Sequence, residues 1–152
     1  MNVPGFNFKL ERVRAVRERA EQLAQQDLAE AISRRSDTET DLRAAEALLE
    51  QAHEQQRGGA ELAVSGDPSE LLAHQAYVER IEAQRTNHAH DLETRESEVA
   101  TRDAQLTKAA SEREMLERLR ERRRSEHYRE VARREQSDLD EVAATNFERS
   151  RA

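Results

Sequence analysis

The most charged stretch of the chain, residues 116–135, reads LERLRERRRSEHYREVARRE and holds eight arginines and five glutamates. The planar guanidinium of arginine can bind either a phosphate or a carboxylate through two parallel hydrogen bonds. Nucleic-acid-binding surfaces are strongly net positive, and five glutamates among the arginines would repel a phosphate backbone. Nucleic acid is therefore the least favoured partner. Two interpretations stay open: a solvated helix face crossed by ion pairs, or an end that docks on another protein.

Catalysis and metal binding have little support in the sequence. There is no cysteine, and no HExxH, CxxC or glycine-rich phosphate-binding motif occurs. Two of the five histidines, His88 and His90, are two positions apart and would point in different directions on a helix. The dense carboxylates are typical of a solvated helix face. The sequence predicts a protein that is not an enzyme and has no catalytic residue, metal site or cofactor.

Composition favours long helices over a globular core. Hydrophobic residues make up 36% of the chain and charged residues 38%, whereas a thick core needs about 45–50% apolar content. The segments 6–57 and 69–152 contain no glycine or proline and are dominated by strong helix formers. We therefore expect an all-α fold in a single coiled-coil domain, residues 1–152. No apolar run is long enough to span a membrane and no secretory signal is present, so we expect a soluble intracellular protein.

The glycines and prolines divide the chain once, which predicts a helix over 6–57, a hinge over 58–68 and a second helix over 69–148. Asp67 is suited to accept hydrogen bonds from the first free amides of the second helix. Pro68 suits the first helical position, and Glu70 would complete a capping box with Asp67. Asn7 is a weaker cap for the first helix.

Apolar residues recur at the spacing of a coiled-coil seam, the stripe along which paired helices meet. In the second helix a seven-residue repeat runs through Leu71, Val78, Arg85, Leu92, Val99 and Leu106, and the other seam position is filled in part by Ile81, Ala89, Ala109 and Leu116. In the first helix the stripe includes Leu10, Val13, Val16, Ala20, Leu23, Leu28, Ile32, Leu42, Ala45 and Leu49, with an apparent slip in register around residues 24–28. Six acid-before-base pairs at i,i+4 support the helices locally: Glu30/Arg34, Glu39/Arg43, Asp91/Arg95, Glu98/Arg102, Glu114/Arg118 and Glu130/Arg134.

Two helices joined by a short hinge should fold back as an antiparallel hairpin. Pairing outward from the hinge places Leu10 near residue 120, so residues of roughly 125–148 form an overhang without a partner in the chain. The overhang still has an apolar face, made of Tyr128, Val131, Ala132, Leu139, Val142 and Phe147. We expect the end formed by Phe6, Phe8 and this overhang to dock on a partner.

A second candidate surface follows the hinge. Tyr77, Ile81, Gln84 and His88 recur at spacings of three to four residues and line one helical face. Two interpretations stay open for this face: a packing stripe against the first helix, or a site for a partner.

Three segments, in this order and around this hinge, resemble the flagellar FliJ family over essentially the whole chain. They are the opening FNFKLERVRAVRERAEQLA, the post-hinge QAYVERIEAQR, and the closing LERLRERRRSEHYRE with SDLDEVAATNFER. The resemblance implies an antiparallel coiled coil similar to the γ stalk of rotary ATP synthases. It also implies a cytoplasmic component of the flagellar type III export apparatus, associated peripherally with the flagellar base at the inner membrane and monomeric when free.

The resemblance further implies three protein partners and no nucleic acid. The open end would insert into the hexameric export ATPase and promote its assembly and activity. Another region would contact the cytoplasmic domain of the transmembrane export-gate subunit, and export chaperones also bind members of the family. By position the gate contact falls on Tyr77, Ile81, Gln84, His88, Leu42, Ala45 and Leu48.

The hypothesis for the ATPase ring assigns its contacts to the aromatic opening, the arginines and the overhang. These residues are Phe6, Phe8, Arg118, Arg120, Arg122, Arg123, Arg124, Arg129, Arg133, Arg134, Leu139, Val142 and Phe147. Two alternatives remain: a structural or adaptor coiled coil with no ATPase partner, and the stalk of an injectisome, a related secretion system.

Overall fold

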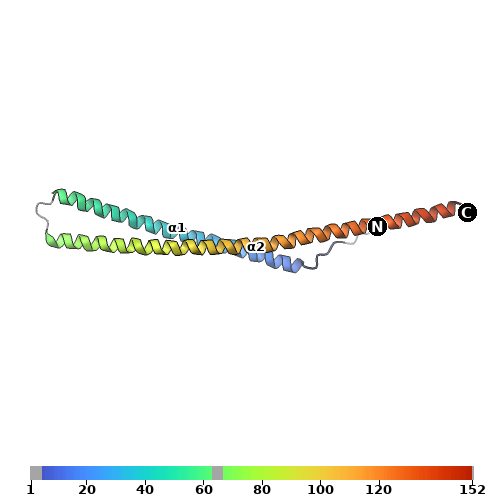
Figure 1. Cartoon of the computed structure of the whole chain (residues 1–152), viewed down its shortest axis with the longest axis horizontal. Coiled ribbons are helices and arrows are strands. Elements are labelled where there is room, and N and C mark those ends of the chain that lie inside the picture. The colour runs from blue at the N-terminus through green and yellow to red at the C-terminus, as the bar shows by residue number, and fades with distance from the viewer. Residues whose placement is uncertain (1–4, 63–66, 152) are drawn as a thin grey trace. The chain divides into compact units, whose positions relative to one another are not determined.

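Two long helices make up the fold in the computed structural model, which describes residues 5–62 and 67–151 (Figure 1). They are α1, Glu11–Leu62, and α2, Pro68–Arg151, and no strand occurs within the described residues. The two helices pack against each other in opposite directions. The expected all-α hairpin is confirmed.

The first helix begins five residues later than expected. Phe6, Asn7 and Phe8 precede it, and the backbone amide of Glu11 donates to the carbonyl of Phe8 at 3.0 Å. Phe8 is buried against α2, so a tertiary contact of this aromatic side chain overrides the helical tendency of the segment. The expected start at residue 6 and the cap at Asn7 are therefore wrong.

The first helix also ends later than expected, because it continues through Gly58 and Gly59 to Leu62. Neither glycine has a positive φ. Glycine in a helix interior costs about 1 kcal/mol relative to alanine but does not forbid the helix. The expected end at residue 57 is wrong, and the central part of the expected hinge, 63–66, lies outside the described residues.

The start of α2 matches the expected cap in its main feature. The Asp67 carboxylate accepts hydrogen bonds from the Ser69 amide at 3.1 Å and the Ser69 hydroxyl at 2.6 Å. These two bonds hold the pKa of Asp67 below its usual range, the hydroxyl having the larger effect. Between Glu70 and Asp67, both described, the only hydrogen bond runs from the Glu70 amide to the Asp67 carbonyl. The reciprocal side-chain half of the capping box is not formed.

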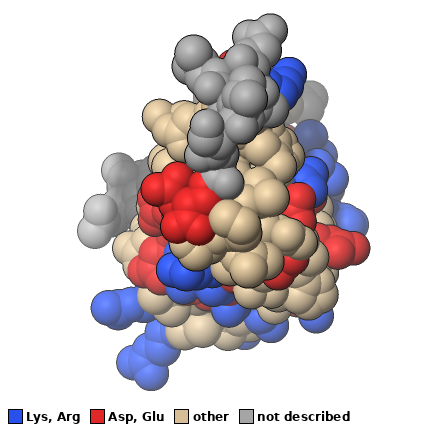
Figure 2. Space-filling view, turned by 90° about the vertical axis from the view of Figure 1, so that its left-hand side faces the viewer, with Lys and Arg blue, Asp and Glu red and all other residues tan. Residues whose placement is uncertain are grey.

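Packing divides the chain into two units, each made of one segment from either helix. We call residues 23–106 the central unit and residues 1–22 with 107–152 the terminal unit. The central unit holds 8 basic and 18 acidic side chains, a net charge of −10, and the terminal unit holds 17 and 14, a net charge of +3. Figure 2 looks onto the end of the hairpin at which α1 ends and α2 begins, where acidic side chains gather beside uncharged ones.

In the central unit the seam follows an unbroken heptad. Its α1 side consists of Ala24, Leu28, Ala31, Arg35, Thr38, Leu42, Ala45, Leu49 and Ala52, all buried or half-buried. Leu23 and Ile32, by contrast, are 56% and 47% exposed. The expected slip in register is therefore wrong in this unit. Small alanines occupy the positions that face α2 because they let two helix backbones approach closely.

On the α2 side of the same seam, only some of the expected residues face α1. Val78, Leu92, Val99 and Leu106 are half-buried as the heptad predicts, whereas Leu71 and Arg85 are exposed. The second seam position is occupied by His74, Ile81, His88, Arg95 and Arg102, not by Ala89, which is exposed. A seam with this many polar side chains buries little apolar area.

Ion pairs between the helices show the register of the central unit. Arg34 pairs with Glu98 at 2.8 Å, Arg35 with Glu96 at 3.7 Å, and Arg102 with Asp27 at 3.4 Å. These partners explain why only three of the six expected i,i+4 pairs form: Glu39/Arg43, Glu114/Arg118 and Glu130/Arg134. Arg34 and Arg102 reach across to the opposite helix, and Arg95 pairs with Glu98.

In the terminal unit the two helix segments are also antiparallel. Arg17 pairs with Glu112 at 2.6 Å, and Arg120 pairs with Glu11 at 3.6 Å. Since Glu11 lies opposite Arg120, the expected position of Leu10 near residue 120 is confirmed. Every described side chain from 136 to 150 is exposed, so the overhang begins later along α2 than the expected residue 125.

Candidate protein-docking sites

The arginine stretch of α2 is crossed by ion pairs to nearby glutamates. Six of its eight arginines have such a pair within the described residues: Arg118 with Glu114, Arg120 with Glu117 and Glu11, Arg122 and Arg123 with Glu126, Arg124 with Glu121, and Arg134 with Glu130. Most of these side chains are largely solvent-exposed, so each pair adds little stability and is easily exchanged for a partner's carboxylate. Arg129 and Arg133 have no ion pair in the part of the chain that the structure describes. A solvated face and a docking face are thus compatible on the same stretch.

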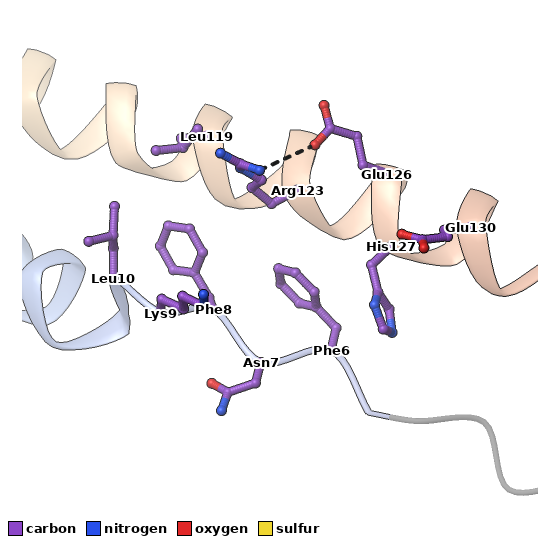
Figure 3. A pocket seen from close by; sticks show the side chains of 10 residues that line it. All are labelled: Phe6, Asn7, Phe8, Lys9, Leu10, Leu119, Arg123, Glu126, His127 and Glu130. Carbon is purple, nitrogen blue, oxygen red and sulfur yellow. Dashed lines mark ion pairs between the residues drawn. The ribbon is translucent and has the colours of Figure 1, made fainter.

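The aromatic opening packs onto this same stretch of α2 (Figure 3). The rings of Phe6 and Phe8 stack with centroids 6.4 Å apart, and Phe6 lies 5.8 Å from the ring of His127. His127 in turn meets Tyr128 edge-on at 5.5 Å. The expectation that α2 lacks a partner from residue 125 onward is therefore wrong at His127, because the non-helical opening extends the pairing beyond the start of α1.

A cavity of about 490 Å³ lies between the opening and α2. Its lining combines aromatic and aliphatic side chains with charged ones, as Figure 3 shows: Phe6, Phe8, Lys9, Leu10, Leu119, Arg123, Glu126, His127 and Glu130. Arg123 and Glu126 form an ion pair at 3.9 Å within it. The cavity is open to solvent and can receive an apolar side chain next to a charged one.

Electrostatics strengthen the first turn of α1. The guanidinium of Arg14 donates to Glu11 at 2.7 Å, and this hydrogen bond is the main cause that lowers the pKa of Glu11 and raises the pKa of Arg14. Arg120 of α2 adds to the shift of Glu11 through its charge. The ion pair between Glu11 and Arg120 shows that the start of α1 lies next to the arginine stretch.

Beyond the cavity, α2 presents apolar side chains to solvent. Tyr128, Leu139, Val142 and Phe147 are all exposed, Leu139 at 59% and Val142 at 57%. The guanidinium of Arg124 lies 5.9 Å from the Tyr128 ring, close enough for a cation–π contact. Exposed large apolar residues at helical spacing are typical of a docking surface.

The residues assigned by resemblance to the export gate lie together in the central unit, but they differ in exposure. Ile81 is 3% exposed and Ala45 is buried, while Leu42 and His88 are half-buried. Tyr77, Gln84 and Leu48 are exposed. The packing interpretation fits Ile81, Ala45, Leu42 and His88. Only Tyr77, Gln84 and Leu48 are exposed enough to contact a partner.

Sequence reasoning missed Leu72, which is exposed next to Leu71 at the start of α2. Leu72 lies outside the heptad, and the heptad was the signal used to select residues. Another missed feature is His74, whose Nε2 is buried without a hydrogen-bond partner in the described residues.

Within 5–62 and 67–151, no group of three or more His, Cys, Asp or Glu side chains is placed to hold a metal ion. None of the described helices is long and apolar enough to cross a membrane.

Comparison with known proteins gives one family. The family model described as Flagellar FliJ protein matches residues 6–152. No curated protein and no solved structure matches the chain. The match begins at Phe6 and so includes the aromatic opening, the arginine stretch and the exposed end of α2.

Proposed function

The chain belongs to the FliJ family of flagellar proteins, and on this premise we propose that it is the stalk of the hexameric flagellar export ATPase. As a member of this family it is a non-catalytic component of flagellar protein export. In the proposal, the open end, made of the aromatic opening, the arginine stretch and the exposed end of α2, inserts into the ATPase ring and promotes assembly and activity of the hexamer. The protein is cytoplasmic, monomeric when free, and peripherally associated with the flagellar base at the inner membrane.

The observation that supports ring insertion best is the exposed end of α2. Residues 136–150 are all exposed, and they include Leu139 and Val142. Large apolar side chains on a helix favour burial by a partner, at roughly 25 cal/mol per Å² of apolar surface removed from water. The arginines on the preceding turns supply charge for acidic loops of a ring, since their pairs with glutamates are exposed and easily exchanged.

The residues assigned to the ring contact differ in burial and in ion pairing. Phe8 is buried within the terminal unit, so it supports the site by holding the opening against α2. Phe6 lines the cavity and is half-buried. The two arginines without an ion pair in the described residues, Arg129 and Arg133, are the first candidates for direct contacts with carboxylates of the ring.

The second part of the proposal concerns the export gate and the chaperones. Tyr77, Gln84 and Leu48 are the exposed members of the assigned set, and they would form the contact with the cytoplasmic domain of the gate subunit. Ile81, Ala45, Leu42 and His88 would support this contact from the seam. Export chaperones are a further class of partner that family membership suggests.

The gate contact is tested by isothermal titration with the purified cytoplasmic domain of the gate subunit. Tyr77→Asp with Leu48→Asp is expected to abolish binding, because both side chains are exposed and their apolar surface would meet the partner. Ile32→Asp, at another exposed apolar position of the central unit, is the matched control and is expected to bind normally. If both variants bind equally well, this surface is not the contact with the gate subunit.

Complex formation tests the proposal as a whole. Co-purification with the export ATPase is expected to yield a complex in which ATP hydrolysis is stimulated. If the two proteins neither form a complex nor show stimulation, the adaptor interpretation is favoured. An injectisome ATPase bound in preference to the flagellar one would favour the related secretion system.

A further inference from the structure

An apolar surface in the terminal unit lies beside the seam and is used by neither contact proposed above. It consists of Val13 and Val16 on α1 and Met115 and Leu119 on α2. Val16 is 66% exposed and Met115 is 61% exposed. Leu119 is half-buried and also lines the cavity of Figure 3. We call these four residues the lateral face.

The ion pairs of the terminal unit place the four residues on one side of the helix pair. Arg14 pairs with Glu117 at 3.6 Å and Glu11 with Arg120 at 3.6 Å, so Val13 lies opposite residues 118–119. Val16 is one turn after Val13, and Met115 is one turn before Leu119, so each follows its neighbour along the same face of its helix. The lateral face therefore extends from the cavity along both helices.

Basic side chains flank the lateral face. Arg12 and Arg19 lie one turn before and one turn after Val16, and Lys108 lies two turns before Met115 on the same side of α2. None of the three has an ion pair within the described part of the chain, whereas their neighbours Arg14 and Arg17 both do. The terminal unit as a whole has a net charge of +3. Three of the basic side chains without a described ion pair thus lie next to this exposed apolar surface.

We propose that the lateral face docks an amphipathic helix of a separate protein, one with acidic residues on both flanks of its apolar stripe. A third helix can pack against two paired helices and cover exposed apolar side chains on both, as in helical bundles and helix-in-groove complexes. An apolar stripe on the incoming helix would cover Val13, Val16, Met115 and Leu119. Its acidic flanks would pair with Arg12, Arg19 and Lys108. A phosphate backbone fits less well, because it offers nothing apolar to cover four aliphatic side chains.

A designed peptide tests this with the full-length chain. The probe is a fluorescein-labelled helix of about 20 residues, about 30 Å long, with leucines at i, i+3, i+4 and i+7 and glutamates on both flanks. A second peptide has lysines in place of the glutamates. Fluorescence anisotropy is expected to show binding of the acidic peptide that weakens with added salt, and no binding of the basic one.

Variants locate the binding on the protein. Val16→Asp and the pair Arg12→Glu with Arg19→Glu are each expected to weaken binding by about tenfold or more, which corresponds to the loss of a few exposed contacts. Ile32→Asp and Arg80→Glu are the matched controls, an exposed aliphatic residue and a basic residue without a described ion pair, both in the central unit. Both controls are expected to bind as the unchanged chain does. Circular dichroism checks that all variants remain helical.

Three results would overturn the proposal. The first is equal binding of acidic and basic peptides. The second is unchanged affinity in the variants of the lateral face. The third is better binding of a different occupant at the same residues, either a second copy of this chain, detected as self-association lost in Val16→Asp, or duplex DNA, detected as binding lost in Arg12→Glu with Arg19→Glu. Stimulation of the ATPase is expected to persist in these variants, because none of the substituted residues belongs to the proposed ring contact.

Discussion

At the scale of single residues, Asp67 shows how one side chain stabilises the start of a helix. Its carboxylate takes two hydrogen bonds from Ser69, and so satisfies a donor that the first turn of α2 would leave open. The sequence predicted this cap because Asp, Pro and Glu stand in the order that a helix start favours. It did not predict the hydroxyl bond of Ser69, which depends on a side-chain rotamer.

The stabilising effect of Asp67 is expected to depend on pH. Because both bonds lower the pKa of Asp67 in the folded chain, its stabilising effect is present above the ordinary pKa of an aspartate and is lost as pH falls through the lowered value. Asp67→Ala is therefore expected to melt a few degrees lower than the unchanged chain at neutral pH, and this difference shrinks in acid. Thermal melts by circular dichroism at several pH values measure it. Asp67→Asn is the control, since it keeps a capping oxygen and does not titrate; a difference for Asp67→Ala that is the same at all pH values would contradict the account.

At the scale of elements, the sequence predicted which segments are helical far better than which faces meet. Glycine and proline positions located the two helices, and the heptad of α2 located one of its two seam positions. The seam of α1 was predicted wrongly at Leu23 and Ile32, because side-chain hydrophobicity favours leucine and isoleucine over the alanines next to them. The opposite helix decides which residues face it, and close approach favours Ala24 and Ala31.

Ile81 tests the register of the seam. It is the only large aliphatic side chain among the buried residues of the described chain, so Ile81→Ala is expected to destabilise the fold by about 2 kcal/mol or more. Ile32→Ala makes the same change at an exposed position and should cost less than about 0.5 kcal/mol. Urea unfolding followed by circular dichroism compares the two. Equal losses, or a larger loss at Ile32, would mean that the register described here is wrong.

Gly58 and Gly59 test where α1 ends. Both are helical, and a Cβ added at either position would meet nothing within 4 Å. Gly58→Ala and Gly59→Ala should each stabilise the chain by about 0.5–1 kcal/mol, because alanine loses less conformational freedom in a helix. The same urea titration measures this gain. Destabilisation by either substitution would instead support a helix that ends before residue 58.

At the scale of the whole molecule, charge and exposed apolar surface are distributed unevenly between the two units. The central unit is strongly acidic and the terminal unit is weakly basic, and the exposed arginines and the exposed end of α2 belong to the terminal unit. The sequence alone allows the charge of each unit to be counted once packing has set the unit boundaries. It did not predict that Phe6 and Phe8 pack on α2, since a contact between distant segments leaves no local periodic signal.

Stimulation of the export ATPase by variants of the exposed end of α2 tests the central claim most directly. We expect Leu139→Asp with Val142→Asp to lose stimulation, because both side chains are exposed and their apolar surface would be buried in the ring. Leu23→Asp, at an exposed position of the central unit, is the matched control and should stimulate normally. Hydrolysis rates are measured with each purified variant added to the ATPase. Loss of stimulation in the double variant alone is the predicted result, and equal stimulation by all three proteins would contradict insertion of this end into the ring.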